Sequence, residues 1–517
     1  MTQSSKQRTA GGERHRLPAI TRWRWRAAFV VLWAVAPLAL QAQTPLPPVD
    51  AEAIYRRLEQ QDAELQWLRS RLSEVPALTA AQSGDAAASA FRQPQAQYAS
   101  ATANEFDELK SRLAAVEEAQ AKAKPEESAG GWIDVSDEKW TVKLGGHVQL
   151  DYITWADADP SIADAQNYFN YRRLRLVADG TGYGQFDFRL QMTLEPGQGS
   201  HDNQYASPDV KDAYVSMNEI PWIGRIRIGN FFVPFSLEQV TNDRNNIFNE
   251  RSIPTQGIFA PGREVGIALY NCTADQNVTW AGGLFFDDLN DTIKTRFDDN
   301  QGYRLSGRLT WLPYYDEPSN GRYLFHTGIG LLHTNDHDDS VRFRARPQVQ
   351  RGPVLIDSGN LAADSYTTGN VEWAIVWGPV TLQNEAFLSQ VNMLSGETVQ
   401  VGGAYSHLSC FLTGENRNFE RFGQHGAQFG RNKPLTNFFA VPGCFGWGAW
   451  EAKARWSYLD LTGANSGRYN DLTMGFNWYW SERTRIMFDW IHPVTSTETV
   501  FGATASDLIA MRFDVNW

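Results

Sequence analysis

The chain has 517 residues, among them 42 Gly, 19 Trp, 18 Tyr and 28 Phe but only 7 Met. This composition is typical of a protein with many strands and turns, and it argues against a helical protein. Its net charge of -12 argues against nucleic acid as a partner, because such a partner selects a basic surface. The three cysteines form no disulfide framework or metal motif, although Cys410 and Cys444 could pair in an oxidising compartment or remain thiols.

Residues 1–42 have the pattern of an export signal. Arg22, Arg24 and Arg26 precede an apolar run, and Ala42 suits the position before a cleavage site. The apolar run is too short to span a membrane comfortably. We therefore expect a signal peptide, whose removal would leave a net charge of about -18.

Residues 43–139 begin with prolines and then show a helical repeat. Leu58, Leu65, Leu68 and Leu72 follow the alternating three- and four-residue spacing of a heptad. No stretch is long enough to be a firm coiled coil by itself. We predict a periplasmic helical or coiled-coil extension that assists oligomerisation, with a solvated amphipathic helix as the alternative.

From Trp140 onward the hydrophobic period changes to two, as expected of strands. Phe186 and Phe188, for example, alternate with Asp187 and Arg189. Candidate strands begin near residues 140, 168, 185, 210, 224, 263, 277, 302, 322, 368, 380, 398, 447, 470, 483 and 506. Most have the roughly 9 to 11 residues that a tilted membrane strand requires. We predict an all-β transmembrane barrel of about 16 antiparallel strands over residues 140–517, because a soluble propeller would show a repeat and none is found.

The last strand, residues 507–517, has the pattern of a barrel seam, which is the strand that closes a barrel. Ile509 and Phe513 fall on one face, whereas Arg512 and Asp514 fall on the other. One face suits lipid and the other suits water. The alternative is the edge strand of a soluble sandwich, which would be an exposed and sticky edge.

The connections fall into two classes of length when successive strands alternate in direction. Residues 378–379 and 481–483 are short and fall on the periplasmic side, whereas residues 235–262 and 333–367 are long and fall outside. Residues 413–446 break this pattern, because they are long yet periplasmic. We expect this segment to fold into the lumen, unless a pair of strands has been missed.

Several short motifs run in order along the predicted barrel. They are Lys143-Leu-Gly-Gly, Arg172-Arg173, Asp212-Ala-Tyr-Val, the stretch from Gly229 to Glu238, Asn249-Glu-Arg-Ser, Arg342-Phe-Arg-Ala-Arg-Pro, Leu412-Thr-Gly-Glu-Asn-Arg, Gly448-Ala-Trp-Glu and Gly475-Phe-Asn-Trp-Tyr. Together they resemble the phosphate-selective porins O and P of Gram-negative outer membranes. The resemblance implies a homotrimer of 16-stranded barrels, a periplasmic N-terminal extension, and a lumen narrowed by loops that fold inward.

The resemblance also implies a path for anions made of successive arginines. The positions that match this ladder are Arg172, Arg173, Arg251, Arg342, Arg344 and Arg346, with Asp212 as the accompanying acid. Arginine suits this task because it stays charged and its planar forked donors replace the hydration that an anion loses. The alternating arginines of residues 342–346 would place three guanidinium groups on one side of an extended loop. Each arginine alone could instead be a solvated or ion-paired surface charge.

Two positions depart from the pattern of a phosphate-specific member. His147 stands where such a member has an arginine. This position in the anion path would therefore carry a positive charge only under mildly acidic conditions. Gln239 stands where such a member has a lysine. The inward charges on the predicted strands also nearly balance, and we therefore expect the loops to set the selectivity.

We predict an outer-membrane porin for passive diffusion of small anions, with phosphate or polyphosphate as the main candidates. The alternatives are a weakly selective general diffusion porin and a plugged structural barrel that tethers the envelope through its coiled coil. No motif of an enzyme, a cofactor or a metal site is found, and the acidic run at residues 336–339 is better explained as a solvated loop. The expected partners are inorganic anions, outer-membrane lipid and lipopolysaccharide.

Overall fold

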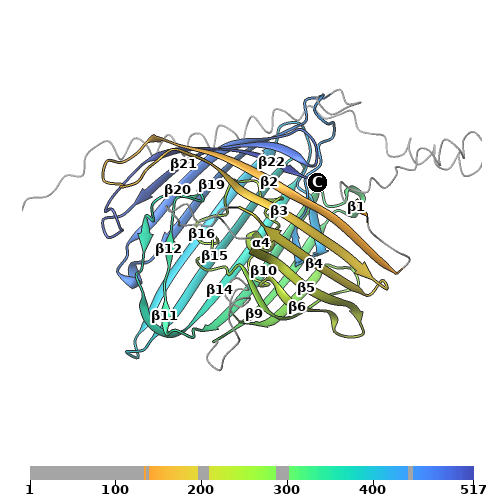
Figure 1. The fold of residues 1–517 in the computed structure, drawn as a ribbon, viewed down its shortest axis with the longest axis horizontal. Coiled ribbons are helices and arrows are strands. Elements are labelled where there is room, and N and C mark those ends of the chain that lie inside the picture. Colours follow the sequence, from red (N-terminus) through yellow and green to blue (C-terminus); the bar gives the residue numbers. More distant parts are fainter. Residues whose placement is uncertain (1–132, 135–138, 196–208, 287–301, 440–445) are drawn as a thin grey trace, which may run out of the picture. The chain divides into compact units, whose positions relative to one another are not determined.

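The computed structural model describes residues 133–134, 139–195, 209–286, 302–439 and 446–517, which include a closed antiparallel β-barrel (Figure 1). The predicted signal peptide, the predicted heptads and Cys444 lie outside the described residues. Sixteen strands form the wall in the described part of the chain: β2 (Trp140–Asp157), β3 (Tyr168–Gly182), β4 (Phe186–Thr193), β5 (Asp209–Ile220), β6 (Gly224–Phe232), β7 (Arg263–Cys272), β8 (Val278–Phe285), β9 (Tyr303–Tyr315), β10 (Tyr323–Asn335), β14 (Leu361–Trp377), β15 (Val380–Met393), β16 (Thr398–Phe411), β19 (Ala449–Asp460), β20 (Arg468–Tyr479), β21 (Thr484–Thr495) and β22 (Asp507–Asn516).

The wall closes where β2 pairs with β22. In this register Gln149 lies opposite Asp514, and Asp151 lies opposite Arg512. Two nitrogens of Arg512 donate to the two carboxylate oxygens of Asp151 at 2.6 and 2.7 Å. The short strand β1 (Ile133–Asp134) pairs with Lys143 and Leu144 of β2, ahead of the residues of β2 that pair with β22. The prediction that the last strand is the barrel seam is confirmed.

Side chains on the wall alternate in the opposite sense to those of a soluble barrel. On β22, Ala510, Arg512 and Asp514 are buried, whereas Met511 and Phe513 are 43% and 36% exposed. Apolar side chains therefore cover the outer face and charged side chains fill the inside, as a strand between lipid and an aqueous lumen requires. Among the described residues, no helix is long and apolar enough to cross a membrane.

The predicted positions of the strands are confirmed, except that one strand begins earlier than predicted and several strands are longer than predicted. β14 begins at Leu361 rather than near residue 368, and the other strands begin within two residues of the predicted positions. β2 and β14 have 18 and 17 residues, which is longer than predicted. The first residues of β14 pair with β11 (Ser340–Val341), a strand of a connecting loop. The sequence did not reveal this extension because it lacks the apolar and polar alternation of a strand that faces lipid.

The connections leave the barrel at two ends. We call the end with the short connections, such as residues 221–223 and 378–379, the turn end, and we call the opposite end the loop end. The long connections at residues 233–262 and 336–360 lie at the loop end, as predicted.

Residues 412–448 join β16 to β19 at the turn end, and the predicted irregularity is real. Their described part contains β17 (Phe419–Gly423) and β18 (Gly426–Phe429), which pair with each other and not with the wall. The described part of this segment therefore contains no pair of wall strands. The segment instead contacts inward-facing side chains of the wall, among them Arg308 of β9, which donates to the carbonyl of Ala427 at 2.9 Å.

Candidate functional site

Residues 235–262, which we call the inward loop, cross the lumen between β6 and β7 and include the helical turn α4 (Leu237–Val240). Inward side chains of the wall hold its backbone: Lys453 donates to the carbonyl of Ile247 at 2.6 Å, and Arg485 donates to that of Asn246 at 2.7 Å. On the β15 side, Glu385 accepts hydrogen bonds from two backbone N–H groups at the start of α4. Backbone groups away from bulk water need such partners, so the wall itself fixes the path of the loop.

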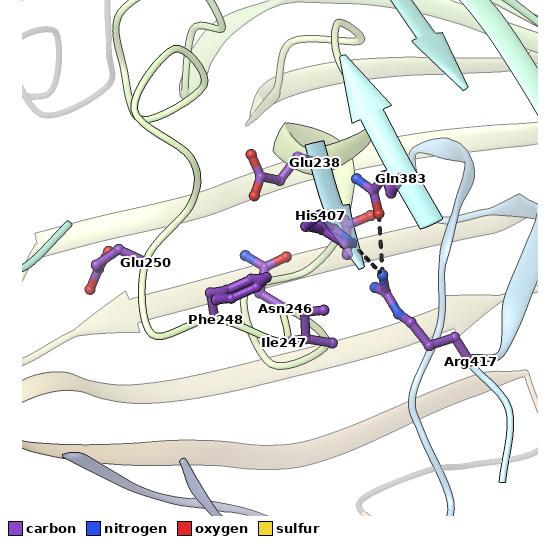
Figure 2. A pocket seen from close by; sticks show the side chains of 9 residues that line it. Glu238, Asn246, Ile247, Phe248, Glu250, Gln383, His407 and Arg417 are labelled. Carbon is purple, nitrogen blue, oxygen red and sulfur yellow. Dashed lines mark hydrogen bonds between the residues drawn. The ribbon is translucent and has the colours of Figure 1, made fainter. Parts of the chain in front are cut away.

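The inward turn-end segment, residues 413–439, reaches the inward loop from the other end of the barrel. The backbone N–H of Phe429 donates to Oγ1 of Thr241 at 3.3 Å, and Asn245 donates to the carbonyl of Phe429 at 3.3 Å. A cavity of about 10 Å³ lies close to this meeting point, with His407 and Arg417 among its lining residues (Figure 2). The lumen is therefore occupied from both ends.

Two consecutive arginines of β3 both face the lumen because the strand contains a bulge. Gln149 of β2 pairs with Arg173, and the next residue Leu150 pairs with Tyr171, so that Arg172 is the extra residue. In a regular strand, neighbouring side chains point to opposite faces, and a bulge removes this restriction. The side chains of Arg172 and Arg173 are 11% and 6% exposed, which is consistent with an inward position.

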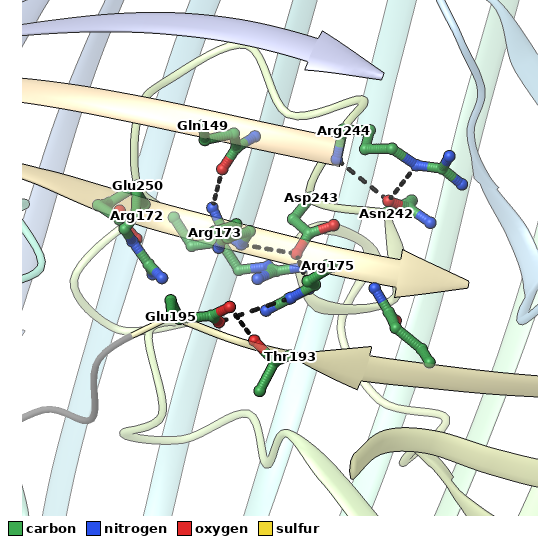
Figure 3. Close-up of polar contacts among 12 residues, drawn as sticks. Gln149, Arg172, Arg173, Arg175, Thr193, Glu195, Asn242, Asp243, Arg244 and Glu250 are labelled. Atoms are coloured by element: carbon green, nitrogen blue, oxygen red, sulfur yellow. Dashed lines mark hydrogen bonds and ion pairs between the residues drawn. The ribbon is translucent and has the colours of Figure 1, made fainter. Parts of the chain in front are cut away.

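Two carboxylates of the inward loop meet three arginines of β3 (Figure 3). Arg172 forms a two-contact ion pair with Glu250, with nitrogen to oxygen distances of 2.5 and 2.8 Å. Arg175 donates to Asp243 at 2.6 Å, and Nε of Arg173 lies 2.8 Å from the same carboxylate oxygen. Burial raises the pKa of Asp243, but the two guanidinium groups outweigh burial and hold this pKa well below its usual range. Asp243 is therefore a fixed negative charge beside the arginines.

Glu250 also connects this group to the barrel seam. Nη2 of Arg512 on β22 donates to Glu250 at 2.9 Å, and Arg512 also donates to the carbonyl of Asn249. The carboxylate of Glu250 is therefore shared by an arginine of β3 and an arginine of the last strand. Charge-assisted pairs of this kind, once enclosed, fix the position of the loop that carries the carboxylate.

The predicted residues His147 and Asp212 lie on the lumen side of β2 and β5. His147 pairs in register with Arg175, is buried, and has no hydrogen-bond partner for either ring nitrogen among the described residues. Asp212 accepts from two nitrogens of Arg263 at 2.8 and 3.2 Å and lies 3.7 Å from Nε of Arg189. The acid predicted to accompany the arginines therefore neutralises Arg263, which the sequence reasoning did not single out.

Arg251 and Gln239 are engaged within the inward loop. Arg251 donates to the backbone carbonyls of Glu238, Gln239 and Thr241 at 3.1, 3.1 and 2.9 Å. The side-chain amide of Gln239 donates to the carbonyl of Pro261 at 2.9 Å. Arg251 therefore closes the loop on itself, and its guanidinium group has no carboxylate partner among the described residues.

The loop-end connection carries the predicted arginines Arg342, Arg344 and Arg346, with β12 (Arg344–Ala345) and β13 (Ile356–Asp357) forming a small hairpin. Arg342 and Arg344 are exposed, whereas the intervening Phe343 is buried. The predicted alternation is therefore observed, because an extended chain turns successive side chains to opposite faces.

These three arginines differ in their partners. Arg342 forms a two-contact ion pair with Asp357 at 2.5 and 2.8 Å. Arg346 donates to the carbonyl of Gly352 at 2.9 Å, and Arg344 forms no ion pair with any described residue. Ring contacts between Phe343 and Phe259 join this connection to the inward loop, with centroids 5.8 Å apart.

The carboxylates and several of the cations where the inward loop meets β3 were not predicted as site residues. Asp243, Arg244 and Glu250 lie in the inward loop, where no periodic pattern marks their direction. Their proximity to β3 depends on the path of the loop, and the sequence signal was that Glu250 lies within the matching motif at residues 249–252 while Asp243 and Arg244 lie a few residues before it. Within the described ranges, no group of three or more His, Cys, Asp or Glu side chains could hold a metal ion.

The chain is similar to several known proteins. The profile of the family described as phosphate-selective porin O and P matches residues 142–517. Porin O of Pseudomonas aeruginosa is 22% identical over 401 residues, which cover 71% of this chain and 86% of the relative. Among solved structures, a loop-deletion mutant of OmpT from Vibrio cholerae has a TM-score of 0.47 and 10% identity, covering 74% of this chain and 100% of that chain. An anion-selective porin from Comamonas acidovorans has a TM-score of 0.45 and 13% identity, covering 73% of this chain and 100% of that chain.

Proposed function

Because the chain belongs to the phosphate-selective porin O and P family of outer-membrane β-barrels, we propose that it lets small inorganic anions diffuse passively across the outer membrane, phosphate or polyphosphate in particular. The observation that carries this proposal is the group of three inward guanidinium groups on β3, Arg172, Arg173 and Arg175, where the inward loop crosses the lumen. Arginine remains charged there and offers several N–H donors to a passing anion.

Further arginines extend the positive charge from this group toward both ends. At the loop end, Arg344 and Arg346 have no ion-pair partner among the described residues. Toward the turn end, Arg244 donates only to Asn242 in the described part of the chain, and it lines a second cavity together with Arg431. Guanidinium groups without a carboxylate keep donors free to replace the hydration of an anion.

Carboxylates limit the net charge at the constriction itself. Asp243, Glu250 and Asp212 each form close ion pairs with arginines of the wall. The inward charge is therefore largely compensated, and we infer that the loop-end arginines set much of the preference for anions. A weakly selective diffusion porin is the second candidate, because compensation of this kind favours ions of neither sign.

The proposal includes a homotrimer, following the family resemblance, and an outer face in contact with lipid and lipopolysaccharide. Native electrophoresis of the detergent-extracted protein, with and without a chemical cross-linker, tests the trimer. A purely monomeric species under both conditions would contradict it.

The transport proposal is tested by reversal potentials across planar bilayers, with chloride and phosphate gradients. We expect a clear preference for anions over potassium and a reduction of the chloride current by phosphate. Equal permeability to chloride and potassium without phosphate block would establish the weakly selective pore instead. A complete absence of conductance would indicate a barrel plugged by its two inward segments.

A further inference from the structure

The inward turn-end segment leaves the lumen by passing over the rim of the barrel beside β20. Asn432 is buried on the lumen side, where its side-chain amide donates to the hydroxyl of the inward residue Tyr479 at 3.2 Å. Further along the segment, the backbone N–H of Phe438 donates to the carbonyl of Trp480 at 2.8 Å, directly after the same strand ends. The backbone of the segment is therefore fixed at the rim itself.

The ring of Phe438 packs on side chains that point away from the lumen. Successive side chains of a strand alternate between its two faces, so Trp478 and Trp480 point outward on either side of the inward Tyr479. The ring centroid of Phe438 lies 4.7 Å from that of Trp478 and 5.2 Å from that of Trp480. Trp480 also contacts the outward residue Phe513 of β22, with centroids 6.1 Å apart. Phe438 therefore lies on the outer face of the wall.

Aromatic side chains around this contact are open to the surroundings. Phe439 is 61% exposed, and its ring centroid lies 4.2 Å from that of Phe438. Trp447 is 71% exposed, and its carbonyl accepts from Nε1 of Trp478 at 2.7 Å. The ring of Trp478 also stacks on Trp450 of β19, with centroids 5.0 Å apart. We call this group of side chains the turn-end aromatic patch: Phe438, Phe439, Trp447, Trp450, Trp478 and Trp480.

The order of side chains across the rim matches the boundary between lipid and water. On the outer face of β20, the exposed apolar residue Phe476 is followed at alternate positions by Trp478 and Trp480. Beyond them, in the turn between β20 and β21, the carboxylate of Glu482 lies 3.6 Å from Nζ of the exposed residue Lys433. Tryptophan is enriched where hydrocarbon gives way to head groups, and lysine extends its charge toward water. A bilayer requires this order, whereas a protein partner does not.

We propose that phospholipid of the leaflet at the turn end covers the turn-end aromatic patch, and that Phe439 and Trp447 anchor the inward turn-end segment in the head-group region. The patch continues the lipid-facing wall, because Trp450 contacts the outward residue Phe476 with centroids 5.8 Å apart. Large aromatic side chains with a polar group are stable where one end is apolar and the other is wet. The anchor is independent of the ion that passes through the lumen.

The anchor belongs to the same segment that occupies the lumen. Inside the barrel, Phe429 contacts the inward loop through Thr241. Between this contact and the rim, the backbone N–H of Leu435 donates to Glu415 at 2.9 Å. The bilayer therefore holds, from outside, a segment that narrows the lumen from inside.

Fluorescence quenching in vesicles tests the contact with lipid. In a chain whose three cysteines are replaced by serine, Phe439→Cys carries an environment-sensitive fluorophore. Ala274→Cys, in the exposed polar turn between β7 and β8, is the matched control at the same end. The vesicles consist of phosphatidylcholine that bears a nitroxide near the head-group end of one acyl chain. We expect this lipid to quench the label at position 439, and aqueous iodide to quench the label at position 274.

The other results of this experiment would contradict the anchor. Quenching of the label at position 439 by iodide alone would show that water covers the patch. Protection from both quenchers would show that protein covers it, either a second copy of this chain or a different partner. Neither result depends on ion selectivity, so the anchor and the proposed transport of anions fail in separate experiments.

Single-channel recordings test whether the anchor holds the segment. Phe439 and Trp447 are replaced together by serine, whereas Trp222→Ser is the control, because it removes a 99% exposed tryptophan from the turn between β5 and β6. We expect more frequent current fluctuations in the double variant, since its segment is held only by contacts with the barrel. Trp222→Ser should behave like the native protein. Native recordings from the double variant would refute a role of the anchor in holding the segment.

Discussion

Asp243 accepts a hydrogen bond from Arg175 at 2.6 Å, although the two residues belong to different elements that approach the lumen from the loop end and from the wall. The same carboxylate oxygen lies 2.8 Å from Nε of Arg173. One acid of the inward loop thus compensates two arginines of β3, and it lowers the net positive charge on this part of the lumen wall.

We predict that Asp243→Asn increases the preference for anions. The substitution keeps the size of the side chain but removes the charge that compensates Arg173 and Arg175. An electrostatic change of roughly 1 kcal/mol would raise the ratio of chloride to potassium permeability about fivefold. Reversal potentials in a potassium chloride gradient measure this ratio, and an unchanged or reduced ratio would show that these arginines do not face the ion path.

We predict that Glu250→Ala destabilises the barrel. The substitution leaves Arg172 without its carboxylate and removes one of the two acids around Arg512, both in enclosed positions. Breaking an enclosed ion pair from one side costs about 3–5 kcal/mol. The midpoint of urea unfolding in lipid vesicles should fall accordingly. Arg342→Gln is the matched control, because it breaks an exposed pair and should leave the midpoint unchanged.

We predict that the combined substitution of Arg342, Arg344 and Arg346 by Gln lowers anion conductance mainly at low salt. These arginines attract anions from a distance, and salt screens this attraction beyond about 10 Å at 0.1 M. Single-channel conductance should fall about two- to fivefold at low ionic strength and change little near 1 M. An equal loss at both salt concentrations would indicate a change in pore shape instead of lost attraction.

We predict that Arg251→Gln makes the constriction less selective by loosening the inward loop. The guanidinium group closes the loop through three backbone carbonyls, which the shorter amide cannot all reach. Single-channel recordings should show a larger and noisier conductance with a weaker preference for anions. Arg251→Lys keeps the charge but not the forked donors. If Arg251→Lys behaved like the native protein while Arg251→Gln did not, charge alone would account for the effect.

The wall of the barrel and its closing strand could be predicted from the sequence alone. The alternation of apolar and polar residues is local, and a strand between lipid and a wet lumen can satisfy it in one orientation only. This is why Phe513 could be placed outside, and Arg512 inside, before any tertiary contact was known. The irregular turn-end connection could be recognised for the same reason, because the direction of each strand fixes the side of every connection.

Which charged side chains meet inside the barrel could not be predicted in this way, because it depends on contacts between distant parts of the chain. The bulge that turns both Arg172 and Arg173 inward depends on pairing with β2, and the sequence of β3 alone does not predict it. Glu250 and Arg512 are 262 residues apart in the chain, and they meet because the inward loop follows backbone contacts to several distant strands. Such a path is set by hydrogen bonds and ion pairs across the lumen, which leave no periodic trace in the sequence.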